Sequence, residues 1–322
     1  MVFLKEVAME KILELIKKYN RIIIFGHVRP DGDCIGSQYG MYHIIKDSFP
    51  EKEVYISGEF SEYVGFIGKP TMVDDSLIKG SLALCVDAAT AERISDQRYK
   101  DCDYILKIDH HVPVDDFGDY NYVDDKSPAC AEIITNFYLK YKDILKLSKA
   151  AATALYVGIN TDTGRFKYDS VTSKTFNSAA ILLDHGVDLS YIENHLSVES
   201  LDTLKLRGYC LSNFKMTKNG FAYIEMTRDI INKYGVSDED AASQVTSISS
   251  IDCCPVWAVF IEYPTEIRIR LRSRGPVINT LAEKYSGGGH PKAAGGRLEN
   301  WNQLNQFLED VDKLVKEYKE NI

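Results

Sequence analysis

The sequence contains no apolar run that approaches the ~20 residues needed for a membrane-spanning helix. Residues 1–18 mix charged and apolar positions, which predicts an amphipathic leading helix and argues against a secretory signal peptide. Internal repeats and low-complexity segments are also absent. We therefore expect an ordinary globular protein that makes no membrane contact.

Cysteine is present, but not in the spacing that binds structural zinc. The seven cysteines form no CxxC pair, and two of them, Cys253 and Cys254, are adjacent. An odd number of cysteines without an export signal fits reduced thiols in a cytoplasmic protein. We expect each cysteine to act as a small buried apolar side chain.

Positive charge is not in excess. The chain carries 38 Lys and Arg against 47 Asp and Glu, a formal net charge of -9. This argues against a broad basic surface for a long duplex nucleic acid. It leaves room for a small anionic substrate, because a few local cations or metal ions can outweigh the overall field. The 322 residues are enough for two domains, and 45% of them are apolar.

The first half of the chain alternates strand and helix signals. Strands are predicted at residues 21–25, 53–57, 81–87 and 104–109, helices at 1–18, 35–46, 127–141 and 172–185, and a helix or buried segment at 149–159. This alternation predicts an α/β domain over residues 1–187, with a doubly wound and mainly parallel sheet.

The pattern changes after residue 187. Residues 188–211 are charged and predict a helical linker. Residues 212–322 predict a smaller α+β domain with a more antiparallel sheet, and we expect a cleft between the two domains. Its strands are predicted at 220–226, 256–263 and 266–272, and its helices at 238–250, 276–285 and 301–318.

Metal-binding side chains follow four apolar segments, each where the segment ends. They are His27, Asp31 and Asp33 after residues 22–25, Asp87 after 82–86, Asp109, His110 and His111 after 104–108, and Asn160 and Asp162 after 155–159. In open α/β sheets, ligands bind at the carboxyl ends of the strands. We therefore expect these side chains to meet in space.

The chemistry of this set indicates divalent metal ions. Carboxylates mixed with imidazoles, and no thiolate at a matching position, suit Mn²⁺, Mg²⁺ or Fe²⁺ better than structural zinc. Because the set exceeds the needs of one ion, it suggests a two-metal site of the kind found in phosphatases and nucleases. Taken singly, Asp162 could be a helix cap, His27 a core histidine, and Asp31-Gly32-Asp33 a plain turn. The recurrence at four segment ends favours the metal site.

Two features near the C-terminus indicate anion binding. Arg268, Arg270 and Arg272 alternate with apolar residues, so they line one face of a predicted strand. They could grip phosphate, or they could be the solvated face of an edge strand. Residues 287–289 are all glycine and could form a phosphate cradle or a flexible turn.

Together these motifs resemble the DHH phosphoesterases. The resemblance rests on Asp109-His110-His111, His27-x-x-x-Asp31-Gly32-Asp33 with Gly36-Ser37, Asp87, and Asn160-x-Asp162-x-Gly164. It extends to Gly287-Gly288-Gly289-His290 with Ala293-Ala294-Gly295, which is similar to the family's DHH-associated domain.

The resemblance implies two Mn²⁺ ions, with Mg²⁺ or Co²⁺ as possible substitutes. One ion would be held by His27, Asp31 and Asp87, and the other by Asp33, Asp87, His110 and Asp162, with Asp87 bridging. A water or hydroxide between the ions would be the nucleophile. Asp109 would orient its neighbours, and His111 would contact the phosphate or assist the leaving oxygen. The residues implied for the nucleotide end of the substrate are Arg270, Arg272, Ser273, Gly288, Gly289 and His290.

Size and layout are most similar to family members that degrade very short RNAs. Such enzymes cut short single-stranded RNA to mononucleotides, and many convert 3′-phosphoadenosine 5′-phosphate to AMP. The alternatives are a soluble phosphodiesterase for cyclic or linear dinucleotides and a nucleotide-binding module without activity. A long-substrate exonuclease and a pyrophosphatase fit less well, because they carry other accessory domains. A homodimer through the first domain is compatible with the resemblance.

Overall fold

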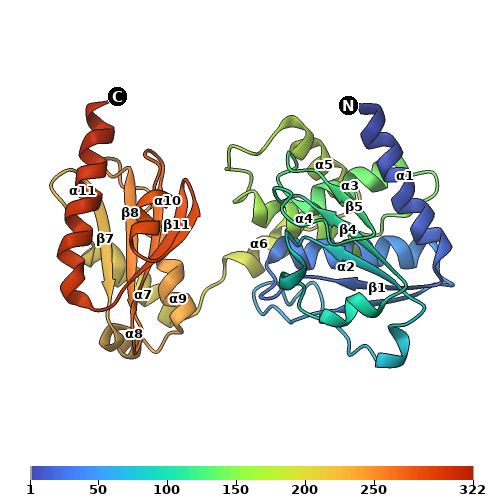
Figure 1. Cartoon of the computed structure of the whole chain (residues 1–322), viewed down its shortest axis with the longest axis horizontal. Helices are drawn as coiled ribbons and strands as arrows, with labels where there is room; N and C mark the ends of the chain where they lie inside the picture. Colours follow the sequence, from blue (N-terminus) through green and yellow to red (C-terminus); the bar gives the residue numbers. More distant parts are fainter. Residues whose placement is uncertain (1, 322) are drawn as a thin grey trace. The chain divides into compact units, whose positions relative to one another are not determined.

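The computed structural model describes the backbone of residues 2–321 and the side chains of residues 9–321. The chain divides into two compact units, Met1–Val198 and Glu199–Ile322 (Figure 1). The helical segment predicted at 188–211 is shared between them. Helix α6 (Leu189–Ser197) lies in the first unit and helix α7 (Leu201–Asn213) in the second.

The first unit contains one five-stranded sheet in the order β2-β1-β3-β4-β5. All its neighbouring strands are parallel, which confirms the parallel α/β prediction. Its strands are β1 (Arg21–Phe25), β2 (Glu53–Ser57), β3 (Leu82–Val86), β4 (Tyr104–Asp109) and β5 (Tyr120–Val123). The order reverses between β1 and β3, so their carboxyl ends form the switch point at which open α/β sheets bind ligands.

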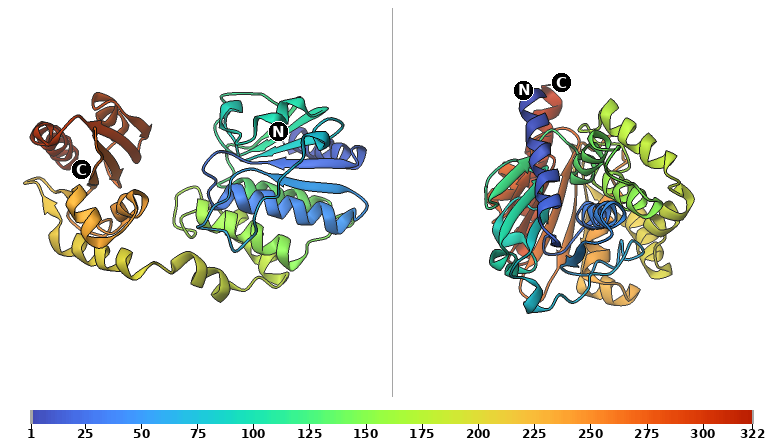
Figure 2. Two further views of the ribbon diagram at one scale, coloured as in Figure 1. Left: turned by 90° about the horizontal axis from the view of Figure 1, so that it is seen from below. Right: turned by 90° about the vertical axis from the view of Figure 1, so that its right-hand side faces the viewer.

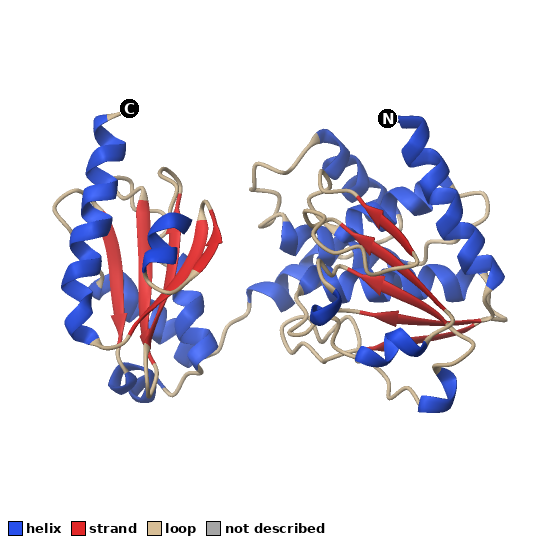
Figure 3. Cartoon of the chain, viewed as in Figure 1, coloured by secondary structure: helices blue, strands red, loops and turns tan. Residues whose placement is uncertain are grey.

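Helices cover one face of this sheet and short 3-10 turns lie on the other. The larger core packs the strands against α-helices, and the smaller one packs them against loops and turns (Figures 2 and 3). The remaining α-helices of this unit are α1 (Val2–Lys18), α2 (Gly32–Ser48), α3 (Cys130–Lys140), α4 (Lys149–Asp162) and α5 (Ser173–Asp184), and the 3-10 helices are η1 (Asp75–Leu77), η2 (Ala91–Arg93) and η3 (Gln97–Asp101). The leading helix was predicted from residue 1, which lies outside the described residues.

Helix α4 decides between the two alternatives left open for residues 149–159, a helix or a buried segment, in favour of the helix. Residues 149–162 form one continuous helix that Ser148 caps by accepting a hydrogen bond from the Ala151 amide. Its alanines are strong helix formers, and most of the helix is buried on all sides, so the apolar run resembled a buried strand. Asp162 is therefore the last residue of a helix.

The second unit contains a six-stranded mixed sheet in the order β10-β11-β9-β8-β7-β6. Only β7 and β8 pair in parallel, as the prediction of a more antiparallel sheet requires. The strands are β6 (Lys215–Met216), β7 (Phe221–Met226), β8 (Val256–Glu262), β9 (Ile267–Ser273), β10 (Gly288–His290) and β11 (Ala293–Leu298). The helices are α8 (Arg228–Tyr234), α9 (Asp238–Ser243), η4 (Gln244–Thr246), α10 (Asn279–Lys284), η5 (Trp301–Gln303) and α11 (Leu304–Glu320).

The structure excludes one alternative for each of two features of this unit. The arginine-rich strand β9 is not an edge strand, because it lies between β11 and β8. The glycine run is not simply a flexible turn, because Gly288 and Gly289 belong to the edge strand β10, which pairs with β11. Within the described part of the chain, no helix is both long enough and apolar enough to span a bilayer.

Candidate metal centre

Strand ends of the first unit deliver three groups of side chains to one edge of the sheet. His27 follows β1, Asp87 follows β3, and Asp109 ends β4 just before His110 and His111. Because β3 pairs with both β1 and β4 in parallel, these ends are neighbours. Asp87 adopts a left-handed conformation with φ of 57°, which Asp tolerates better than most residues do.

Helices α2 and α4 add the remaining acids. Asp31 caps α2 and accepts hydrogen bonds from the Asp33 and Cys34 amides, each at 3.0 Å. Asp33 in the first turn is buried, and its carboxylate accepts hydrogen bonds from the Cys130 and Ala131 amides at 2.6 and 2.9 Å. Asp162 ends α4. The backbone amides at the N-terminus of α3 thus hold the Asp33 carboxylate close to Asp162 at the end of α4.

The predicted ligands lie within a few ångströms of one another. His27 Nε2 lies 3.5 Å from Asp87 Oδ2 and 3.7 Å from Asp31 Oδ1. His110 Nε2 lies 3.3 Å from Asp87 Oδ1, 3.3 Å from Asp162 Oδ2 and 3.7 Å from Asp33 Oδ2. Asp87 therefore lies between two groups of ligand atoms, with one carboxylate oxygen toward each imidazole.

Hydrogen bonds at the far side of each imidazole fix its orientation. His27 Nδ1 lies 2.9 Å from the Val28 carbonyl oxygen, and His110 Nδ1 lies 3.2 Å from that of Ser127. A carbonyl oxygen can only accept, so both Nδ1 atoms carry the proton, and in the neutral ring Nε2 presents a lone pair to the carboxylates. In the neutral rings lone pairs would face lone pairs, so the arrangement is favourable only with a proton on Nε2 or a metal cation between the atoms. Among the described residues, the buried Asp87 Oδ1 also finds no hydrogen-bond partner.

Bound protons can neutralise the negative charge of these carboxylates, and the pKa values of the cluster show this. Burial lowers the pKa of His110, but Asp87, Asp33 and Asp162 outweigh it and raise that pKa to about 10. Burial, together with Asp87 and Asp31, raises the pKa of Asp162 to about 7. The pKa of Asp33 is also raised, by burial first and then by Asp87 and Asp162. This cluster of acids is stable only when protons or other cations neutralise it.

Asp109 and His111 form a second pair at the edge of this cluster. The Asp109 carboxylate is fully buried, and its Oδ1 accepts a hydrogen bond from His111 Nδ1 at 2.8 Å. Burial raises the pKa of Asp109, but His111 and Lys107 outweigh this effect and lower it. The half-exposed His111 ring is thereby held with Nε2 free to meet a substrate oxygen.

Lys107 was not identified from the sequence, although it lies two residues before the motif. Its ammonium group is buried, lies 3.3 Å from Asp109 Oδ2, and donates to the Ala89 and Asp115 carbonyl oxygens at 3.1 and 3.0 Å. A buried lysine needs such partners. The only sequence signal was a lysine inside an otherwise apolar strand.

A thiol also lies in the cluster, which corrects the expectation that no sulfur stands near it. The buried Cys34 Sγ accepts a hydrogen bond from the His27 amide at 3.3 Å. Its sulfur, one His27 nitrogen and one Asp87 oxygen lie within 4.8 Å of one another. Cys34 was missed because its helix begins at Gly32, three residues earlier than the sequence predicted.

The residues expected to bind substrate lie in the second unit. Arg270 is exposed and Arg272 partly buried on β9, whereas Gly288, Gly289 and His290 form β10. Ser273 is buried, and its hydroxyl donates to the Pro276 carbonyl oxygen at 2.6 Å. In this structure Ser273 therefore stabilises a turn.

Comparison with known proteins agrees with this geometry. The model of the DHH family N-terminal domain matches residues 21–159, and the DHHA1 domain model matches residues 219–317. The bifunctional oligoribonuclease and PAP phosphatase NrnA of Bacillus subtilis is 36% identical, over 96% of this chain and 99% of its own. This chain belongs to the DHH family.

Two further relatives of this DHH protein extend over its whole length. The probable bifunctional oligoribonuclease and PAP phosphatase NrnA of Streptococcus mutans is 38% identical, over 96% of this chain and 99% of its own. The crystal structure of an exopolyphosphatase-related protein from Bacteroides fragilis superposes with a TM-score of 0.86 at 27% identity, and the match covers 97% of this chain and 98% of that one. The resemblance inferred from the motifs is thereby confirmed.

Proposed function

We propose that this DHH protein hydrolyses very short RNA oligonucleotides to mononucleotides and 3′-phosphoadenosine 5′-phosphate to AMP, using two divalent metal ions. One observation carries the proposal: the Nε2 atoms of two imidazoles converge on the two oxygens of the buried Asp87 carboxylate, an arrangement that suits two divalent cations. The choice of substrates is supported by two NrnA proteins, which are 36% and 38% identical to this chain over 96% of its length.

The donor atoms fit two ions that share one carboxylate. We assign His27, Asp31 and Asp87 to the first ion, and Asp33, Asp87, His110 and Asp162 to the second. Carboxylate oxygens mixed with imidazole nitrogens suit Mn²⁺, and Mg²⁺ or Co²⁺ are reasonable substitutes. Bound at this edge of the sheet, the ions would activate a water nucleophile and neutralise charge on the phosphoryl oxygens.

The protein's own groups then perform the remaining tasks. Asp109 holds the His111 ring with its proton on Nδ1, so His111 Nε2 is the atom that meets a phosphoryl or leaving oxygen. The Asp33 carboxylate is fixed by two amides, which keeps it in place before substrate arrives. For the nucleotide end of the substrate we assign Arg270, Arg272, Gly288, Gly289 and His290, with Ser273 shaping the adjacent turn.

Product analysis tests this function. Purified protein with Mn²⁺ is offered RNAs of two to five nucleotides, 3′-phosphoadenosine 5′-phosphate, a cyclic dinucleotide and pyrophosphate in parallel. We expect mononucleotides from the RNAs and AMP from the bisphosphate, and loss of both after chelation. Turnover of the cyclic dinucleotide alone would overturn the substrate assignment, and tight nucleotide binding without turnover would indicate a binding module.

A further inference from the structure

Helices cover only part of one face of the second sheet. On that face, α7, α8 and α9 pack over Ala222, Ile224 and Met226 of β7 and over Trp257, Val259 and Ile261 of β8. The side chains of β9 and β11 that face the same way include Arg268, Arg270 and Arg297, which are exposed, and Arg272, which is partly buried. Sheets of this size usually bury both faces. The open half is therefore available to a ligand.

Strand register arranges this open half into rows. Arg272 pairs with Ala293, which in turn pairs with His290 on β10. The next row joins Arg270, Gly295 and Gly288. These two rows contain Arg270, Arg272, Gly288 and His290, four of the five residues assigned above to the nucleotide end of the substrate; Gly289 lies between the rows and pairs with Ala294. The third row places Arg268 directly opposite Arg297.

The glycines of the middle row are not explained by packing inside the protein. A Cβ atom added to Gly288 would meet no described atom within 4 Å, and one added to Gly295 would meet only the Ile269 carbonyl oxygen, at 3.1 Å. Glycine weakens a strand unless another group approaches its backbone closely. A groove of about 360 Å³ lies beside Gly295, and its lining includes Arg268, Arg270, Gly287 and Arg297.

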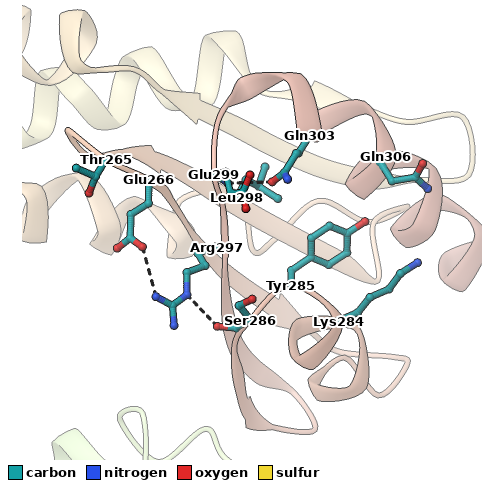
Figure 4. A pocket seen from close by; sticks show the side chains of 10 residues that line it. All are labelled: Thr265, Glu266, Lys284, Tyr285, Ser286, Arg297, Leu298, Glu299, Gln303 and Gln306. Atoms are coloured by element: carbon teal, nitrogen blue, oxygen red, sulfur yellow. Dashed lines mark hydrogen bonds and ion pairs between the residues drawn. The ribbon is translucent and has the colours of Figure 1, made fainter.

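The third row concentrates positive charge. Like charges directly opposite each other destabilise a sheet. The Glu266 carboxylate forms ion pairs with both arginines. Its oxygens lie 2.7 Å from Arg268 Nε and 3.6 Å from Arg297 Nη1. Figure 4 shows Arg297 reaching toward Glu266 and toward the Ser286 carbonyl oxygen. Two guanidinium groups and one carboxylate leave a net positive charge, and the arginine side chains are 57% and 60% exposed.

Packing fixes these guanidinium groups in place. The Arg268 guanidinium lies 4.2 Å from the centre of the Tyr263 ring. Arg297 Nε donates a hydrogen bond to the Ser286 carbonyl oxygen at 3.1 Å. A positioned arginine loses less side-chain entropy when it binds a phosphate.

We propose that Arg268 and Arg297 form a second phosphate subsite, which binds the backbone of an RNA one nucleotide beyond the end held by the first two rows. The proposal rests on the proposed function, since it concerns the same substrate. Consecutive rows are two residues apart, about 6.6–6.8 Å along the strand, which is comparable to one extended nucleotide step. The subsite therefore favours RNAs of three or more nucleotides over dinucleotides.

Binding measurements test this subsite without relying on turnover. The full-length protein, Arg268→Gln, Arg297→Gln and the double variant are titrated with a labelled pentaadenylate in EDTA, with unlabelled diadenylate as competitor. We expect the double variant to lose about tenfold in pentanucleotide affinity and less than twofold in dinucleotide affinity. Each single variant should also lower the salt slope of pentanucleotide binding by about 0.7, the value for one single-strand phosphate contact.

Lys313→Gln is the matched control, because it removes one exposed positive charge from α11 of the same unit. The ratio of pentanucleotide to dinucleotide affinity should not change in this variant. Equal losses for both ligands, the same loss in Lys313→Gln, or no length preference in the unsubstituted protein would each overturn the subsite. Failure of the proposed function would look different: the unsubstituted protein would bind RNA with length preference but release no mononucleotides with Mn²⁺.

Discussion

Asp87 combines three properties that seldom occur together in one residue. It is buried, its backbone is left-handed, and each of its carboxylate oxygens faces an imidazole nitrogen. Burial raises the pKa of Asp87, but His110 and His27 outweigh this effect and hold the pKa below its ordinary value. A buried charge costs stability unless partners compensate it, and residues with such perturbed pKa values cluster at functional sites.

The Asp87→Asn variant tests whether Asp87 is needed for metal binding and turnover but not for folding. Asn has the same shape and tolerates positive φ, but it cannot bridge two cations as a carboxylate does. We expect turnover of short RNA to fall below detection and bound Mn²⁺ to fall below two per chain, measured by activity and by equilibrium dialysis. Circular dichroism should still report a folded chain. A variant that keeps both activity and two ions would contradict the bridging assignment.

Lys107 provides a second prediction at this scale. Its ammonium group joins Asp109 to the segments around Ala89 and Asp115, so its loss frees the carboxylate that orients His111. We expect Lys107→Met to lower kcat by about 10–100-fold, as loss of groups behind metal ligands typically does, with little change in KM. Lys107→Arg, which keeps the charge, should recover part of kcat.

The control for Lys107 is Lys52, another buried lysine of the same unit. Its ammonium group donates to the Lys17 and Tyr19 carbonyl oxygens, in contacts that do not include the metal cluster. Lys52→Met should lower the melting temperature and leave kcat nearly unchanged. If both methionine variants lost kcat to the same extent, the role of Lys107 would be structural only.

At the scale of elements, the contact between α2 and α4 sets the distance between two ligand acids. A Cβ atom on Gly36 of α2 would lie 2.5 Å from the Ala154 carbonyl oxygen and 2.8 Å from the Gly158 amide nitrogen of α4. One on Gly158 would lie 2.8 Å from Asp33 Oδ1. Small residues at this crossing therefore allow Asp33 and Asp162 to approach each other closely enough to hold the second proposed ion.

Gly36→Ala tests this contact. The added methyl group must push α2 away from backbone atoms, so we expect a loss of about 1–3 kcal/mol in unfolding free energy and weaker Mn²⁺ binding. Urea unfolding and calorimetric titration measure the two effects. The control is Gly208→Ala in α7, where a Cβ would meet no described atom within 4 Å. It should stabilise by about 0.5–1 kcal/mol. Unchanged metal affinity in Gly36→Ala would show that this contact does not position the ligands.

The strands and helices of the first unit also show which elements could be predicted from sequence patterns and which could not. Residues 22–25 and 82–86 were predictable as strands, because they are short apolar runs that end in polar residues. Residues 155–159 gave the same signal but belong to α4, because a helix buried on all sides has no polar face to mark its period. Strand β5 was missed because its four residues, Tyr120–Val123, alternate little and are only partly buried.

For the whole molecule, local pattern predicted that the acids and imidazoles at the segment ends lie together, but not every contact that they make. The histidines and aspartates named from the segment ends do lie together in the first unit. Cys34, at the start of α2, joins them through the hydrogen bond that its sulfur accepts from the His27 amide, and Lys107 joins them by pairing with Asp109 on the same strand. The pairing of Arg268 with Arg297 depends on the register of β9 and β11, which no local signal encodes.

The metal cluster also makes the stability of the first unit depend on pH and on metal. The pKa of His110 is about 10 in the folded protein and 6.5 in its ordinary state, so the folded form binds extra protons between these values. The stabilisation from this group is fully present below pH 6.5 and is lost as pH rises toward 10. Asp162, with a pKa raised to about 7, adds the same trend at lower pH.

We therefore expect the metal-free protein to melt at progressively lower temperature between pH 6.5 and 10. Added Mn²⁺ should raise the melting temperature more at pH 9 than at pH 6.5, because metal and protons compete for the same atoms. Calorimetry with and without EDTA measures both trends. Hydrogen exchange should place the metal-dependent protection in residues 9–198, because the acid and imidazole cluster lies in that unit. A metal-free protein whose stability rose over this pH range would show that protons do not hold the cluster together.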